Sequence, residues 1–427
     1  MKLFSDFLLG AATAAHQVEG NNTKSDFWAQ EQMVHTVFAE PSGTACEHYE
    51  RYEQDIRLLA EAGMNAYRFS IEWARIEPEE GRFEETEVEH YRDMIRCCKR
   101  YGLTPVVTMH HFSCPVWVIA KGGWEVESVI QDFTRYCVYV MQRLGSELNY
   151  VCTINEVNMG LQVALFAEKF AKRKAKYGKA NAESAVQVGM NAESLENVNH
   201  ARRQEYKAIF CVEEPQTFLV SRTERGDQIV ARAHASARDA MKELCPHLKI
   251  GMTLSLHAFQ PLPGGEQRVQ YEWDREFRHY LPYMEGDDFL GVQNYTRALV
   301  DADGWADGPE GVEKTQMHYE FYPAALAQVI RDVAKDFHGE LLVTEHGVAV
   351  ADDARRVCFI DEAMKGVKGC MEDGIPVKGY FYWSLLDNFE WQKGYALTFG
   401  LIAVDRATQK RMPKPSLYHL GSYRERM

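Results

Sequence analysis

The sequence lacks the features that mark several large classes of protein. Its 427 residues contain no apolar run of about twenty, the length that a membrane-spanning helix needs. Lysine and arginine number 48 against 62 acidic residues, a net charge of −14, whereas a nucleic-acid groove normally carries a basic surplus. No glycine-rich phosphate loop follows a predicted strand. Membrane spans, nucleic-acid partners and nucleotide-binding open sheets are therefore disfavoured.

Metal-binding cysteine motifs are also missing. The ten cysteines form no CxxC pair and show no ordered spacing with histidine, so we expect reduced thiols packed as small hydrophobes in a cytoplasmic protein. The apolar N-terminal run from Leu3 to Ala15 is interrupted by Ser5, Asp6 and Gly10, which favours a first strand over a signal peptide. We expect neither a metal nor a cofactor.

Hydrophobic residues, by contrast, make up 46% of the chain, enough for a large core. Eight strand-like runs are predicted at 7–13, 66–70, 105–111, 150–155, 249–256, 289–295, 341–345 and 378–384. Amphipathic helical segments lie between them, at 49–62, 87–101, 126–144, 228–244, 323–337 and 353–371. Regular alternation of strand and helix indicates parallel strands, and eight units favour a closed (β/α)8 TIM barrel over a doubly wound sheet.

One stretch departs from this alternation. Residues 161–223 form a long polar insertion after the fourth predicted strand, which in a barrel would lie near the catalytic rim. Repeats and low-complexity tracts are missing, so we expect residues 1–427 to form one catalytic domain with extended loops at the C-terminal ends of the strands. The sequence is compatible with a homo-oligomer.

Two predicted strands end in a glutamate. Glu156 follows the fourth strand, and Glu345 ends the seventh. A carboxylate at the end of a buried strand is costly unless it has a partner or a function. A pair of carboxyl groups is what cleavage of a glycosidic bond requires.

Other polar and aromatic residues fall at or near the same strand ends, and in a barrel these ends meet at one rim. Planar polar groups bind sugar hydroxyls, and aromatic rings pack against sugar faces. The residues concerned are Gln17, Arg68, His111, Asn155, Tyr295, Trp383, Glu390 and Trp391. The predicted partner is therefore a small-molecule glycoside or oligosaccharide.

Six segments in order resemble the signatures of glycoside hydrolase family 1, the retaining β-glucosidases and their relatives. They read FLLGAATAAHQVEG, AYRFSIEWARIEP, TINE, TEHG, WSLLDNFEWQKGY and FGLIAVD, and they span almost the whole chain. The resemblance implies a TIM barrel that hydrolyses terminal β-D-glucosyl residues, extending to galactosyl or fucosyl residues, through a covalent glycosyl-enzyme and without a cofactor.

The resemblance also implies roles for individual residues. Glu156 would be the general acid/base and Glu345 the nucleophile, with Arg68 and Tyr295 beside it. The residues that match the sugar-binding set are Gln17, His111, Asn155, Trp383, Glu390 and Trp391. The chemistry permits this assignment, because one carboxyl must stay protonated while the other is charged.

The chain departs from the family pattern at His346, Val157, Phe112-Ser113 and Gln293. None of these removes a catalytic group. We hypothesise that His346, if protonated and near Glu345, stabilises its carboxylate.

Three alternatives remain open. A 6-phospho-β-glycosidase is disfavoured because the Glu390 carboxylate would repel a phosphate, although Lys393 and Tyr395 follow it. A metal-dependent hydrolase could use His110, His111 and His346, but neighbours on a strand point to opposite faces. A catalytically weak sugar-binding barrel would not need both Glu156 and Glu345.

Overall fold

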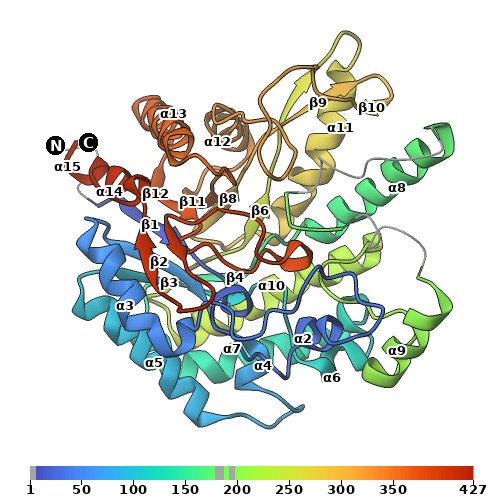
Figure 1. Cartoon of the computed structure of the whole chain (residues 1–427), viewed down its shortest axis with the longest axis vertical. Coiled ribbons are helices and arrows are strands. Elements are labelled where there is room, and N and C mark those ends of the chain that lie inside the picture. Colours follow the sequence, from blue (N-terminus) through green and yellow to red (C-terminus); the bar gives the residue numbers. More distant parts are fainter. Residues whose placement is uncertain (1–5, 178–186, 192–197, 427) are drawn as a thin grey trace.

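The computed structural model describes residues 6–177, 187–191 and 198–426. Its centre is a parallel sheet surrounded by helices (Figure 1). The strands of this sheet are β1 (Leu8–Ala12), β2 (Ala66–Ser70), β3 (Thr104–His110), β4 (Tyr150–Ile154), β5 (Lys249–Gly251), β6 (Thr253–Ser255), β8 (Phe289–Gln293), β11 (Glu340–His346) and β12 (Val377–Trp383). All eight strand predictions are confirmed.

The predicted fifth strand is split in two, and this split closes the barrel. β5 pairs with β4, whereas β6, which starts two residues after β5 ends, pairs with β8. The order β5-β4-β3-β2-β1-β12-β11-β8-β6 therefore returns to its starting point. The TIM barrel expected from the strand–helix alternation is confirmed, and the open sheet is wrong.

Helices cover the outside of the barrel. The longer ones are α3 (His48–Glu61), α5 (Glu85–Arg100), α7 (Ser128–Leu144), α10 (Glu224–Leu244), α11 (Glu266–Glu276), α12 (Ala325–Asp336) and α13 (Asp353–Glu372). Shorter ones are α1 (Ala15–Val18), α2 (Asp26–Glu31), α4 (Trp73–Ile76), α6 (Val116–Ala120), α14 (Pro415–Gly421) and α15 (Tyr423–Arg426). Their buried apolar faces and the barrel strands form one large hydrophobic core.

Two small sheets and two further helices lie outside the barrel sheet. β7 (Ala258–Pro261), β9 (Arg297–Asp301) and β10 (Gly304–Trp305) form a small sheet, and β13 (Ile402–Val404) pairs with β14 (Arg411–Pro413). The segment after β4 contributes α8 (Met159–Tyr177) and α9 (His200–Phe210), which lie at one side of the molecule (Figure 1). Parts of the 161–223 insertion lie outside the described residues.

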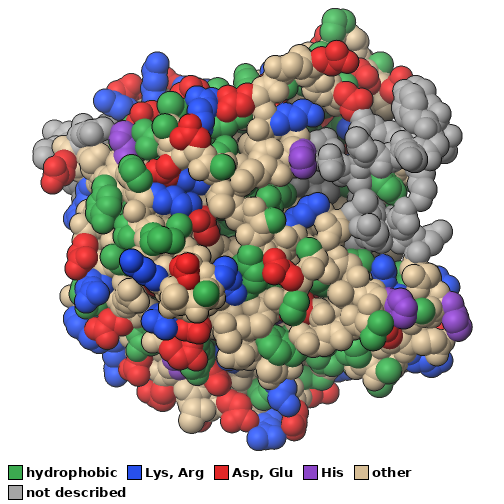
Figure 2. Space-filling model, in the orientation of Figure 1, with side chains coloured by type: hydrophobic (Ala, Val, Ile, Leu, Met, Phe, Trp, Pro, Cys, Tyr) green, Lys and Arg blue, Asp and Glu red, His purple; other side chains and the backbone are tan. Residues whose placement is uncertain are grey.

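The surface agrees with the acidic composition. On the face shown in Figure 2, acidic and basic side chains are interspersed and do not gather into one basic patch. Within the described residues, none of the helices is both long and apolar enough to cross a membrane.

Candidate active site

The ten predicted site residues are all buried and come together at the C-terminal ends of the barrel strands. Arg68 lies on β2, Glu345 on β11 and Trp383 at the end of β12, while Asn155 and Glu156 follow β4. His111 follows β3 directly and Tyr295 lies two residues after β8. Gln17 is on α1, Glu390 lies in the loop after β12, and Trp391 begins the short 3-10 turn Trp391–Lys393.

Glu345 is held by two donors. Arg68 Nη1 donates to Glu345 Oε1 at 2.6 Å, and the Tyr295 hydroxyl donates to Oε2 at 2.7 Å. Burial raises the pKa of the Glu345 carboxyl, whereas the Arg68 cation and the Tyr295 hydrogen bond lower it. Both donors therefore favour the charged form and fix the orientation of both oxygens.

Glu156 has a different environment. Burial raises its pKa well above the usual range, and the neighbouring charge of Glu345 raises it further. A hydrogen bond from Ser255 and the more distant Arg68 oppose this shift. Of the two carboxyls, Glu156 is the one that retains its proton to higher pH, as a general acid must.

Asn155 connects Arg68 to Gln293 and His111. Its Oδ1 accepts from Arg68 Nη2 at 2.6 Å and from Gln293 Nε2 at 2.8 Å. Its Nδ2 lies 3.2 Å from His111 Nε2. Because Nε2 of His111 accepts this bond, the other ring nitrogen, Nδ1, carries the proton, and burial keeps the ring neutral by lowering its pKa.

Aromatic rings and a third glutamate complete the site. The His111 ring lies nearly parallel to those of Trp383 and Trp391, with centroids 5.6 and 6.1 Å away. Gln17 Nε2 donates to Glu390 Oε2 at 3.3 Å and to the Phe389 carbonyl at 2.8 Å. Burial raises the pKa of Glu390 to about 8, partly offset by a backbone hydrogen bond from Gly189.

Several buried polar atoms of the site have no protein partner among the described residues, and two of them suit a ligand. Gln17 Oε1 and His111 Nδ1 have no protein hydrogen-bond partner among the described residues. An unmade hydrogen bond at a buried atom is costly, so such atoms indicate a polar ligand. One acceptor and one donor beside two tryptophans suit the hydroxyls and the apolar face of a sugar.

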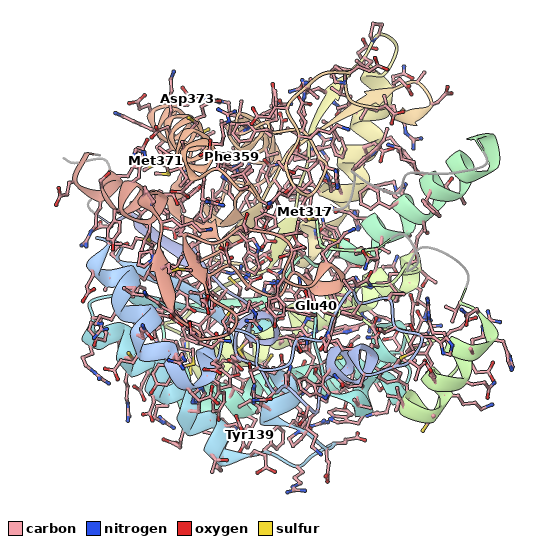
Figure 3. All side chains as sticks on the ribbon, viewed as in Figure 1. Glu40, Tyr139, Met317, Phe359, Met371 and Asp373 are labelled. Carbon is pink, nitrogen blue, oxygen red and sulfur yellow. The ribbon has the colours of Figure 1, made fainter. Side chains whose placement is uncertain are left out.

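The hypothesis about His346 is wrong. Successive residues of β11 point to opposite faces, so His346 faces the outer helices while Glu345 faces the barrel interior. Its ring stacks on Phe359 of α13 at 4.5 Å, and its Nδ1 lies 2.9 Å from the Tyr380 hydroxyl. Figure 3 labels Phe359, which lies on this helix. Burial lowers the pKa of His346 to about 3, so the ring is uncharged.

Sequence reasoning missed several supporting residues, among them Gln293 and Ser255. Gln293, noted only as a departure from the family pattern, holds Asn155 and the hydroxyl of Thr253. Ser255 ends β6 and bonds Glu156, although its sequence context marks it only as part of a strand. Among the described residues, we find no group of three or more histidine, cysteine or acidic side chains placed to hold a metal.

Comparison with known proteins identifies the family of the chain. The model of glycosyl hydrolase family 1 matches residues 1–212 and 285–426. β-Glucosidase A of Thermotoga maritima is 28% identical over 96% of this chain and 95% of its own length. Agrobacterium β-glucosidase is also 28% identical, over 96% of this chain and 93% of its own.

Solved structures show the same fold. A β-glycosidase, BGL167, superposes with a TM-score of 0.87 and 41% identity, covering 99% of this chain and 96% of its own. The Thermotoga maritima β-glucosidase in complex with cyclophellitol gives a TM-score of 0.79 at 25% identity, covering 99% and 98% of the two chains. With the family model matching most of its length, the chain belongs to glycosyl hydrolase family 1.

Proposed function

We propose that this protein is a retaining β-glycosidase that hydrolyses terminal non-reducing β-D-glucosyl residues. The observation that carries the proposal is the unequal environment of the two catalytic carboxyls. Arg68 and Tyr295 both donate to Glu345, whereas burial and the Glu345 charge raise the pKa of Glu156. This difference assigns the nucleophile to Glu345 and the proton to Glu156.

The reaction would proceed in two displacements. Glu345 attacks the anomeric carbon while Glu156 protonates the leaving oxygen, which yields a glycosyl-enzyme and the free aglycone. Glu156, now charged, takes a proton from water, and the hydroxide released to the anomeric carbon displaces Glu345. The first displacement transfers the Glu156 proton to the aglycone and the second restores it from water, so the cycle consumes one water molecule and needs no cofactor.

The glycone would be bound by Gln17, His111, Asn155, Trp383, Glu390 and Trp391. Homologous β-glucosidases include one solved with glucoimidazole and with deoxynojirimycin, which supports a glucose-sized glycone. We extend the proposal to β-galactosides and β-fucosides, because Gln17 and Glu390 present acceptors to hydroxyls of either orientation. We also propose one catalytic domain over residues 1–427, a cytoplasmic location and a homo-oligomer.

A 6-phospho-β-glycosidase remains the disfavoured alternative. Burial raises the pKa of Glu390 to about 8, and its ionised form would repel a phosphate. The Tyr395 hydroxyl donates to the Ser42 carbonyl, and the Arg406 guanidinium packs over the Tyr395 ring. These contacts engage Tyr395 with protein groups rather than with a sugar phosphate.

The decisive experiment combines kinetics with product stereochemistry. We expect hydrolysis of 4-nitrophenyl β-D-glucoside to release β-glucose first, as followed by NMR, and to be unaffected by chelator. Glu345→Gln should lower kcat by on the order of a thousandfold or more, because covalent catalysis is lost. The matched control is Glu340→Gln on the same strand, where Glu340 pairs with Lys249 at the opposite end.

Three outcomes would overturn the proposal. A loss below about tenfold in Glu345→Gln would contradict a nucleophile. Initial release of α-glucose would contradict retention. Faster hydrolysis of the 6-phosphoglucoside than of the glucoside would favour the alternative.

A further inference from the structure

A five-residue segment from the insertion after β4, residues 187–191, lies against the active site. We refer to it as the strap. The strap is hydrogen-bonded to the 3-10 turn Trp391–Lys393. The Gln392 amide donates to the Gly189 carbonyl at 2.9 Å, and the Asn191 amide donates to Gln392 Oε1 at 2.7 Å. Asn191 Nδ2 also donates to the Gln392 carbonyl at 2.7 Å. Three hydrogen bonds to one residue fix the strap beside the sugar-binding loop.

Gly189 contacts the third glutamate directly. Its backbone N–H donates to Glu390 Oε1 at 3.3 Å, on the oxygen that Gln17 does not contact. A Cβ atom at position 189 would lie 2.4 Å from the Glu390 carbonyl oxygen and 2.9 Å from its Cγ. Only glycine therefore allows the strap to approach this closely.

Gln187 connects the strap to both catalytic carboxyls. Its Oε1 accepts from the Tyr295 amide at 2.8 Å, and the Tyr295 side chain donates to Glu345. Its Nε2 donates to Ser255 Oγ at 3.2 Å, and Ser255 hydrogen-bonds Glu156. Nε2 also lies 2.9 Å from His257 Nε2. The strap thus contacts Glu390 itself and one partner of each catalytic glutamate.

We propose that the strap is a positioning element of the glycone site, in which the Gly189 N–H orients the Glu390 carboxylate toward the 4- and 6-hydroxyls of a hexose. This inference rests on the proposed β-glycosidase function. With Gln17 on one oxygen and Gly189 on the other, the carboxylate plane is fixed and its remaining lone pairs are left for the sugar. The strap therefore contributes to the preference for hexosides over pentosides.

The main test is Gly189→Ala, assayed on 4-nitrophenyl β-D-glucoside and β-D-xyloside. The added methyl group displaces the strap from Glu390, so we expect kcat/KM for the glucoside to fall on the order of tenfold, mainly through KM. The loss on the xyloside should be smaller, because a pentose lacks the 6-hydroxyl. The glucoside-to-xyloside ratio therefore falls, which a purely structural role would not produce.

The matched control is Gly308→Ala, where a Cβ meets nothing within 4 Å. We expect it to leave both rates and their ratio unchanged. A folded Gly189→Ala enzyme with the wild-type ratio would overturn the inference, even if its thermal stability is lower.

A second variant and a binding measurement cover the case in which Gly189→Ala does not fold. Gln392→Ala removes the acceptor for the Asn191 amide without adding atoms, and the exposed Gln270→Ala serves as its control. We expect Gln392→Ala to bind deoxynojirimycin on the order of tenfold more weakly in calorimetry, with Gln270→Ala unchanged. Wild-type affinity in a folded Gln392→Ala would overturn the inference.

The two proposals fail in different ways. A wild-type enzyme that hydrolyses neither glycoside would refute the proposed function, and the deoxynojirimycin affinities would still decide the role of the strap. An active wild type with unchanged Gly189→Ala and Gln392→Ala variants would refute the strap alone.

Discussion

Burial, a neighbouring charge and individual hydrogen bonds together set the charge states of Glu345 and Glu156. Burial alone raises the pKa values of Glu345 and Glu156 in the same direction. Their other surroundings differ: Glu345 accepts from the Arg68 cation and the Tyr295 phenol, whereas Glu156 lies beside the Glu345 charge and accepts from the Ser255 hydroxyl. Removing any one of these donors should therefore change the pKa of the carboxyl that it contacts, and with it the pH dependence of catalysis.

Tyr295→Phe tests this at one atom. Removing the hydroxyl that donates to Glu345 Oε2 destabilises the charged carboxylate, so its pKa rises. We expect the acidic limb of the kcat/KM profile to move upward by about 1 pH unit, the value of one hydrogen bond to a charged group. Tyr271→Phe, whose side chain is 47% exposed, should leave the profile unchanged. An acidic limb that stays in place would contradict the role of Tyr295.

The structure brings the ten residues predicted for the site together, and their roles stay predictions. Glu156, Glu345 and the eight partners predicted with them lie in one buried cluster. The hypothesis that His346 stabilises Glu345 does not meet its conditions, because the strand pleat directs the ring to Tyr380 and Phe359 and burial lowers its pKa to about 3. Gln187 could not be predicted, since nothing local shows that position 187 reaches Tyr295.

At the scale of elements, the closure of the barrel depends on the split between β5 and β6. At this split the chain changes its partner from β4 to β8. Gly251, the last residue of β5, lies so close to β8 that a Cβ would be 1.9 Å from the Phe289 carbonyl oxygen. The close approach of these strands therefore requires a residue without a side chain.

Gly251→Ala should consequently loosen the barrel. We expect the free energy of unfolding to fall by about 2 kcal/mol, because the backbone of β8 must shift to make room. Denaturant unfolding followed by tryptophan fluorescence measures this, with Gly308→Ala as the control in open space. An unfolding midpoint equal to that of the wild type would show that the contact between Gly251 of β5 and Phe289 of β8 is not tightly packed.

The sequence predicts the boundaries of the elements to within a few residues, but it does not predict that the strand 249–256 is divided into β5 and β6. The run 249–256 reads as one continuous apolar strand, because apolar patterning reports burial and not the identity of the pairing neighbour. Likewise, α10 starts at Glu224 rather than at the predicted Gln228, because the Thr223 hydroxyl caps it through the Gly226 amide.

For the whole molecule, several buried carboxyls make stability depend on pH. Burial raises the pKa of Glu390 and of Asp26 to about 8, and that of Glu156 well above its usual range. The folded protein therefore binds more protons than the unfolded chain at neutral pH. Buried histidines such as His110 and His346, with pKa values lowered to about 3, act in the opposite direction only below about pH 6.5.

We therefore expect the free energy of unfolding to fall as pH rises from 7 to 8. The slope is set by the difference in bound protons, up to about 1.4 kcal/mol per pH unit for each such carboxyl. Calorimetric melting temperatures at the two pH values measure it. Glu390→Gln, which removes one titrating group, should reduce the slope. A melting temperature that rises from pH 7 to 8 would contradict the assignment.

The pleat of β11 has a consequence for how this enzyme can change. We propose that position 345 serves the reaction, whereas the side chain at position 346 lies in the contact between β11 and α13, although the two positions are adjacent in the chain. Natural or laboratory variation at 346 can therefore explore different packing against α13 while the chemistry at 345 is conserved. Substitutions at position 346 can therefore change the stability of the fold, whereas substitutions at position 345 change the proposed chemistry, although both positions lie on β11.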